Sequence, residues 1–283
     1  MTTVFSGSDA LRRGDLTPYQ LRNRFEAIHR DVYVPAFAEP TLQDRCKAAF
    51  LWSKQRGTVS GLAAAALHGS RWIADDEPVE LIWRNQHAPE GVVTRNERIA
   101  ADEVVVIDDV SVTSLARTAF NLGRRLPRDE AVARLDALAN ATKWRPADTE
   151  ALFARYPGAR GAKSLRAALR LVDAGAQSPR ETSLRLLLID AGLPSPKTQI
   201  LVHNGDFYPL AYLDMGWEDY LVAVEYDGDH HRKDRKQYLK DMSRLRMLEL
   251  RGWIVIRVVA EDHPMDVLDR VRKALASRGF RDS

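Results

Sequence analysis

Residues 179–279 alternate between helix and strand patterns, and their order restricts the fold more than any other feature of the sequence. Apolar residues recur at helical spacing over 179–192, and Gly192 ends that pattern. Three short apolar segments separated by turn residues follow, then a basic amphipathic helix, another apolar segment and a last helix. The strands are expected at 197–204, 207–215, 220–228 and 253–259, and the later helices at 235–252 and 264–279. This order predicts an α/β (α+β) unit with a mixed sheet between helices.

The chain is long enough to hold more than this one unit. Its 283 residues, 45% hydrophobic and 29% charged, are typical of a globular protein with one large domain or two ordinary ones. Ser178-Pro179 opens the C-terminal unit, and no repeat or low-complexity linker precedes it. We therefore expect a boundary near residue 175, and parts that cover 1–40, 41–175 and 176–283.

The sequence has no pattern that predicts a membrane or secretory destination. No apolar run approaches the roughly 20 residues that a membrane-spanning helix needs. The first residues, MTTVFSGSDALRRG, lack the basic and then apolar pattern of a signal peptide. The one cysteine, Cys46, excludes an internal disulfide and a cysteine-based zinc site. We therefore expect a cytoplasmic protein without a membrane partner.

The first forty residues have the pattern of two short helices and a small hairpin. Ser and Gly bracket SGSDALRRG, and Thr17 with Pro18 opens the second helix as cap and first residue. The alternating AIHRDVYVP is typical of a wing. Helix, turn, helix and wing is an arrangement that binds DNA, although it also occurs in proteins that do not. If it binds DNA here, Arg22 and Arg24 are the expected contacts, beside Tyr19, Gln20 and Asn23.

The middle of the chain predicts a small α/β region. Helical patterns cover 41–69, and short alternating apolar pieces then predict a small sheet up to about residue 112. Helical patterns resume from residue 114 and continue to about residue 175.

Acidic residues interrupt the apolar strand patterns of the C-terminal unit. Asp214 is expected at the end of the second strand and Glu225, 11 residues later, at the end of the third, so that a turn and a paired strand place them side by side. Asp227 returns to the face of Glu225 if the strand continues. Converging carboxylates suit Mg²⁺ or Mn²⁺, which can activate a water and neutralise charge on a scissile phosphate. Two other interpretations stay open, namely strand ends that simply meet solvent and a hairpin turn at Asp227-Gly228.

The segment after this acidic cluster is basic. Residues 231–257 contain nine Arg or Lys against three acids, although the net charge of the whole chain is only +3. A local excess of positive charge suits a polyanion, because phosphate contacts provide most nonspecific affinity for nucleic acid. The alternative is a solvated helix face. The residues expected to hold a DNA backbone are Arg232, Lys233, Lys236, Lys240 and Arg244.

Taken together, residues 177–262 resemble the Vsr-like branch of the PD-(D/E)xK nuclease superfamily. The resemblance rests on a helical Glu181, a strand aspartate at Asp214, the motif Glu225-Tyr226-Asp227-Gly228, and His231 after it. Asp241 and Arg244 match the Asp-x-x-Arg that precedes a Gly-Trp strand. The resemblance implies a restriction-endonuclease-like mixed sheet flanked by helices. The superfamily's usual lysine is absent, and Asp227 occupies its place.

This resemblance implies roles for the site residues. Asp214, Glu225 and Asp227 would hold Mg²⁺ (or Mn²⁺). Glu181 would bind the ion through a water, or would hold a group that itself contacts a metal ligand. His231, with an ordinary pKa of roughly 6.5, would activate water or protonate the leaving oxygen. Glu181, Asp214, Glu225, Asp227 and His231 are thus the expected catalytic residues.

The N-terminal half resembles the winged-helix domains of AbiEi-type antitoxins, through LTPYQLRNRF, IHRDVYVP, VSGLAAAALHG and VTSLARTAFNL. In that family the winged helix binds promoter DNA. The combined expectation is a metal-dependent DNA endonuclease that nicks damaged, mismatched or foreign DNA. The alternative is a DNA-binding regulator or antitoxin with a catalytically silent nuclease-like domain. A third option is an RNA-directed nuclease that acts as a toxin.

Overall fold

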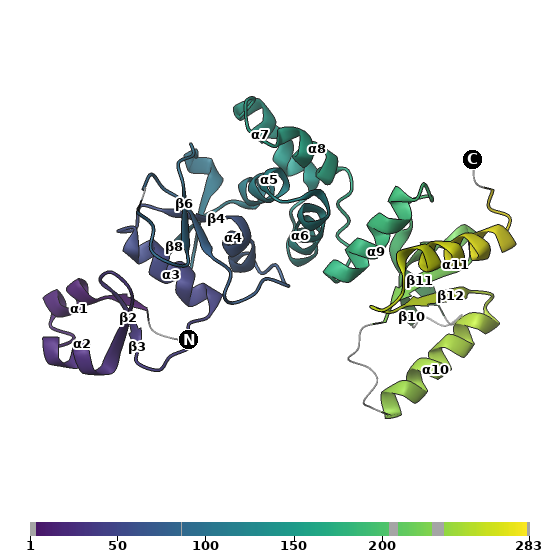
Figure 1. Ribbon diagram of the computed structural model, residues 1–283, viewed down its shortest axis with the longest axis horizontal. Helices are drawn as coiled ribbons and strands as arrows, with labels where there is room; N and C mark the ends of the chain where they lie inside the picture. The colour runs from purple at the N-terminus through teal and green to yellow at the C-terminus, as the bar shows by residue number, and fades with distance from the viewer. Residues whose placement is uncertain (1–3, 86, 204–208, 228–234, 282–283) are drawn as a thin grey trace. The chain divides into compact units, whose positions relative to one another are not determined.

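The computed structural model describes residues 4–85, 87–203, 209–227 and 235–281. The chain forms two compact units, Met1–Val172 and Asp173–Ser283, and each is described by itself. Among the described residues there are eleven α-helices and three sheets of three, five and four strands, with parallel and antiparallel pairs (Figure 1). The predicted mixed α/β class is therefore confirmed at this level. No described helix combines the length and the apolar character that crossing a membrane requires.

The first unit begins with two capped helices and a three-stranded sheet. Ser6 caps α1 (Gly7–Arg13), and Gly14 ends it in the left-handed conformation. Thr17 and Gln20 form a capping box at the start of α2 (Pro18–Arg24). β2 (Phe25–His29) and β3 (Val32–Pro35) form the predicted hairpin. The structure adds β1 (Phe5–Ser6), which pairs with β3, so the sheet order is β1-β3-β2.

A five-stranded sheet forms the centre of the first unit, with the order β6-β5-β4-β8-β7. Its strands are β4 (Thr58–Ser60), β5 (Val79–Ile82), β6 (Val92–Arg95), β7 (Val104–Ile107) and β8 (Val110–Thr113), and the short helix η1 spans Ala101–Glu103. Helices α3 (Leu42–Trp52) and α4 (Gly61–Leu67) pack on it, and together they bury an apolar core. The sequence patterns missed the central β4, because its three residues, all buried, are too few to show an alternation.

Helices complete the first unit. They are α5 (Leu115–Arg125), α6 (Arg128–Ala141), η2 (Pro146–Thr149), α7 (Glu150–Arg155) and α8 (Ala162–Leu169). Phe120, Leu152 and Leu165 join α5, α7 and α8 in one apolar cluster.

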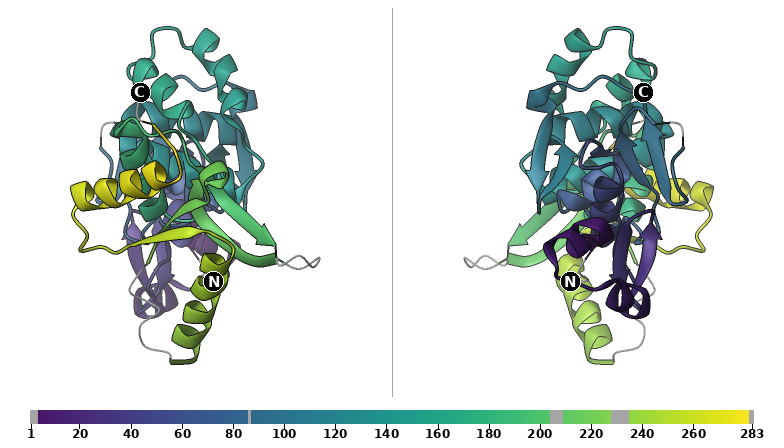
Figure 2. Two further views of the ribbon diagram at one scale, coloured as in Figure 1. Left: turned by 90° about the vertical axis from the view of Figure 1, so that its right-hand side faces the viewer. Right: turned by 90° about the vertical axis from the view of Figure 1, so that its left-hand side faces the viewer.

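The second unit is a four-stranded mixed sheet between helices, as the sequence predicts. Its elements are α9 (Pro179–Asp190), β9 (Lys197–His203), β10 (Pro209–Trp217), η3 (Glu218–Tyr220), β11 (Val222–Tyr226), α10 (Arg235–Leu250), β12 (Ile254–Val258) and α11 (Pro264–Ser277). The sheet order is β12-β11-β10-β9. Within this unit, α9 and α11 cover one face and α10 lies on the other (Figure 1, Figure 2).

Two sequence expectations about this sheet change. β11 and β12 are parallel neighbours joined through α10, so the open alternative of a hairpin at Asp227-Gly228 is wrong; Gly228 itself lies outside the described residues. Asp214 is not at the end of its strand, because β10 continues to Trp217. The strand continues because Met215 and Trp217 pair with Val224 and Val222 and are buried in the apolar core.

Candidate functional site

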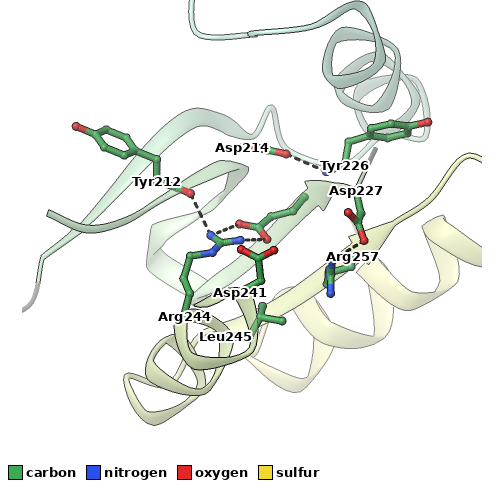
Figure 3. A pocket seen from close by; sticks show the side chains of 9 residues that line it. Tyr212, Asp214, Tyr226, Asp227, Asp241, Arg244, Leu245 and Arg257 are labelled. Carbon is green, nitrogen blue, oxygen red and sulfur yellow. Dashed lines mark hydrogen bonds and ion pairs between the residues drawn. The ribbon is translucent and has the colours of Figure 1, made fainter. Parts of the chain in front are cut away.

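Two carboxylates on neighbouring strands form the centre of the candidate site. β10 and β11 run antiparallel, and their ladder ends with Met215 opposite Val224. Asp214 and Glu225 are the next residues of the two strands, so they lie on neighbouring strands at the same level. Both residues line one cavity of about 380 Å³ (Figure 3). The cavity also has walls from α10 and β12, which contribute Asp241, Arg244 and Arg257.

Glu225 is buried and is held by an arginine of α10. Its side chain is only 8% exposed. Arg244 donates from Nη1 to Glu225 Oε1 at 2.8 Å and from Nη2 to Oε2 at 2.7 Å. The same Nη1 also donates to the Tyr212 carbonyl oxygen at 3.3 Å, as Figure 3 shows. This two-bond pair fixes the plane of the Glu225 carboxylate, since the guanidinium fork matches both oxygens.

Asp214 is the carboxylate whose protonation the site perturbs most. Burial raises the pKa of Asp214 from 3.8 to about 7. The negative charges of Glu181 and Glu225 add to the rise, whereas Arg244 and the Tyr226 N–H, which donates to Asp214 Oδ2 at 2.9 Å, oppose it. Near neutral pH, a positive ion beside Asp214 would therefore relieve an electrostatic cost.

Glu181, at the start of α9, is not one of the residues that line the cavity, but its charge acts on Asp214. Its Oε1 accepts from Ser178 Oγ at 2.9 Å and its Oε2 from the Gln177 N–H at 2.9 Å. Ser178 in turn accepts from the Glu181 N–H at 3.2 Å, so the two residues cap the helix reciprocally. The cap holds the Glu181 carboxylate close enough to Asp214 to affect its pKa.

Asp227 lines the same cavity as Glu225, on the face that alternation predicts. Its backbone N–H donates to the Val258 carbonyl oxygen at 2.8 Å, which extends the β11–β12 pairing by one residue. Its carboxylate forms an ion pair with Arg257 of β12. Each of the two acids that follow β11's apolar run is thus neutralised by an arginine.

The donor chemistry fits a hard divalent cation through two of the three expected ligands. Among the residues that the structure describes, no three His, Cys, Asp or Glu side chains gather closely enough to hold a metal ion. Mg²⁺, however, commonly uses one or two protein carboxylates and keeps several waters. Asp214 and Glu225 meet that requirement, because a carboxylate can accept both bonds from Arg244 and still has lone pairs to offer.

The other expected site residues lie elsewhere or are not described. His231, Arg232 and Lys233 lie outside the described residues. Lys236 and Lys240 lie on α10, but their side chains are not among those described. Arg22 and Arg24 are exposed on α2 of the first unit. The sequence predicts that Arg244 contacts a DNA phosphate, but each Nη of its guanidinium group donates a hydrogen bond to Glu225.

Several residues of the site were not singled out from the sequence. Tyr212, 57% exposed, and Arg257 line the cavity. Arg257 had a signal, because it interrupts the apolar strand WIVIRVV and pairs in register with Glu225. Gln199 has a positive φ of 49° and accepts from Gln177 Nε2 at 2.9 Å. The register of β9 and β10 places Gln199 across from Asp214.

Comparison with known proteins identifies two similar proteins but does not assign the chain to a family. The chain is 32% identical over 150 residues to the uncharacterized proteins MT2308 and Rv2248 of two Mycobacterium tuberculosis strains, CDC 1551 / Oshkosh and ATCC 25618 / H37Rv. The match covers 53% of this chain and 55% of each relative, so the chain spans about half the length of the curated relatives it matches. No family model and no solved structure matches the chain.

Proposed function

We propose that the chain is a metal-dependent endonuclease that hydrolyses phosphodiester bonds of DNA. The observation that carries the proposal is the convergence of Asp214 and Glu225 on adjacent strands. Burial raises the pKa of Asp214, and the negative charges of Glu181 and Glu225 raise it further. Clustered, partly buried carboxylates repel one another, and a site of this kind is typical of a cation-binding centre. The resemblance to Vsr-like nucleases agrees with this proposal.

In this proposal Asp214 and Glu225 hold Mg²⁺ or Mn²⁺ together with waters, and Asp227, paired with Arg257, lines the cavity beside them. When bound, such an ion lowers the pKa of a water and stabilises charge on the scissile phosphate. Arg244 keeps the Glu225 carboxylate in one orientation through its two hydrogen bonds. Arg257 restrains Asp227 through a single ion pair between its Nη2 and Asp227 Oδ2.

The remaining parts of the proposal concern DNA and the proton. The basic residues of 232–240 would contact the phosphate backbone, and His231 would transfer the proton. Arg22 and Arg24, exposed on α2, provide a second basic surface for DNA. A cytoplasmic location is part of the same proposal.

The experiment is a cleavage assay on supercoiled plasmid and mismatched duplexes, with Mg²⁺, Mn²⁺ or chelator. We expect nicking with metal, none with chelator, and a loss of at least roughly 100-fold in Asp214→Asn and Glu225→Gln, a typical scale for removing a catalytic group. Asp269→Asn, an exposed aspartate of α11, is the matched control and should cleave like the wild type. Nicking that is insensitive to chelator or to both site variants would remove the proposal.

One observation favours the regulator as a second candidate. Arg244 and Arg257 already neutralise Glu225 and Asp227, so these two acids do not require a metal for charge balance. A protein of that kind would bind DNA through α2 without cutting it. A gel shift with the gene's upstream DNA, weakened in Arg22→Gln/Arg24→Gln and unaccompanied by cleavage, would support the regulator over the nuclease.

A further inference from the structure

The first unit contains a second cavity, lined by arginines, that the proposed nuclease site does not use. It measures about 480 Å³ and lies between the segment after β6, helix α5 and the segment that joins α7 to α8. Such a volume is within the range of small-ligand sites. Its lining includes one acidic residue, Glu97, and five arginines, namely Arg98, Arg117, Arg124, Arg155 and Arg160.

The inner arginines are fixed in place by acids around the cavity. Arg117, whose side chain is 2% exposed, donates to Glu103 at 2.6 Å and to Glu97 at 3.0 Å. Glu97 also pairs with Arg124, and Glu103 accepts from Arg155 at 2.6 Å. These pairs fix the positions of the inner guanidinium groups, and their positive charge lies behind the rim of the cavity.

One buried hydrogen-bond donor of Arg124 has no acceptor in the part of the chain that the structure describes. The Arg124 side chain is 9% exposed, and its buried Nε has no hydrogen-bond partner among the described residues. Burial lowers the pKa of Arg124, and repulsion from Arg125 and Arg117 lowers it further, even though Glu97 opposes the change. A buried donor without a partner is costly unless a ligand or water satisfies it.

Two further arginines remain available at the rim. Arg98 and Arg160 are exposed, and neither forms a hydrogen bond or ion pair with another part of the chain that the structure describes. The Arg160 loop is held against α5 by Gly161, which has a φ of 83° and at which a Cβ would lie 2.0 Å from the Arg124 carbonyl oxygen. This close approach keeps Arg160 beside Arg124.

We propose that this cavity binds a phosphate group, carried either by a small phosphate ester such as a nucleotide or by the end of a nucleic-acid strand. The exposed rim arginines Arg98 and Arg160 suit a phosphate, because a guanidinium group can donate two parallel hydrogen bonds to its oxygens. The free rim arginines supply the charge that the paired inner arginines lack. The inference does not depend on nuclease activity, since every residue that carries it lies in the first unit.

The test is isothermal titration calorimetry of the full chain at low salt and without added divalent ion, with pyrophosphate, ADP and a 5′-phosphorylated oligonucleotide as probes. Arg98→Gln/Arg160→Gln changes only exposed side chains, so it should fold normally, and Arg56→Gln, at another exposed arginine of the first unit, is the control. We expect the double variant to weaken binding of at least one probe by roughly tenfold or more, since charge-assisted bonds to phosphate are strong. The control should bind as the wild type does.

The same titrations identify the source of the phosphate. Binding of pyrophosphate and ADP that the double variant weakens supports a small ester, and an effect confined to the oligonucleotide supports a strand end. A wild type that binds none of the three probes, or a double variant that binds all of them as tightly as the control does, overturns the proposal.

Discussion

Replacing Asp214 by asparagine removes a buried negative charge and keeps an oxygen that can accept the Tyr226 N–H. The pKa of Asp214 is about 7 in the folded chain, against 3.8 as its ordinary value. The folded state therefore binds this proton more tightly than the unfolded chain does. It follows that the free energy of unfolding contributed by Asp214 falls as pH rises from about 4 to about 7, and that the full cost is present above pH 7.

The size of the effect follows from the same difference. About three pH units correspond to about 4 kcal/mol at most, because one unit is 1.36 kcal/mol. We expect Asp214→Asn to be more stable than the wild type by roughly 3–4 kcal/mol at pH 8 with chelator. At pH 5 we expect a gain of only about 1–2 kcal/mol, because the folded carboxyl is still protonated while the unfolded chain has already released this proton.

Urea unfolding followed by tryptophan fluorescence measures this difference, because Trp217 and Trp253 are buried in the second unit. Asp269→Asn, which changes an exposed aspartate, should not alter the pH dependence of the unfolding free energy. A stability difference between Asp214→Asn and the wild type that is the same at pH 5 and pH 8, or an asparagine variant that is less stable at pH 8, would refute the electrostatic argument.

Three further predictions concern the packing around the sites and the first helices. Arg244→Met leaves the buried Glu225 without its partner and should lower the free energy of unfolding at pH 8 by roughly 3–5 kcal/mol, whereas Arg246→Met, at an exposed arginine of the same helix, should change it little. The double variant Glu225→Gln/Arg244→Met should recover part of this loss, and equal losses in the single and double variants would contradict the pairing. Gly161→Ala places a Cβ 2.0 Å from the Arg124 carbonyl oxygen at a positive φ, so thermal unfolding should show a loss of roughly 1–3 kcal/mol, and an unchanged midpoint would contradict this close approach. Thr17→Ala removes one half of a capping box and should cost about 1 kcal/mol, while Thr17→Ser should restore most of it in the same measurement.

The helices and strands of the second unit could be predicted because local signals mark their ends. Ser178, Pro179 and Gly192 bracket α9, and apolar runs mark β11 and β12. The three residues of β4 carry no such signal, since a strand this short is defined by its partners, β5 and β8, rather than by its own pattern.

The site could be predicted only in part. Spacing placed Asp214 next to Glu225, which the register supports, but it did not show that β10 runs on past Asp214. The basic pattern of α10 predicted a phosphate contact for Arg244, whereas the structure pairs Arg244 with Glu225 across 19 residues of sequence. Ion pairs of this kind depend on how a helix docks on the sheet, and residue spacing along the chain does not determine that.

The central claim is that Asp214 and Glu225 hold a metal ion that cleavage requires. Its most direct test is a titration of the full chain with Mn²⁺ at pH 8, in which bound ion is counted by electron paramagnetic resonance and plasmid nicking is measured on the same samples. We predict that binding and nicking rise together in the wild type and in Asp269→Asn, and that both are lost in Asp214→Asn and Glu225→Gln. Nicking without bound Mn²⁺, or Mn²⁺ bound equally by the wild type and both site variants, would contradict the claim.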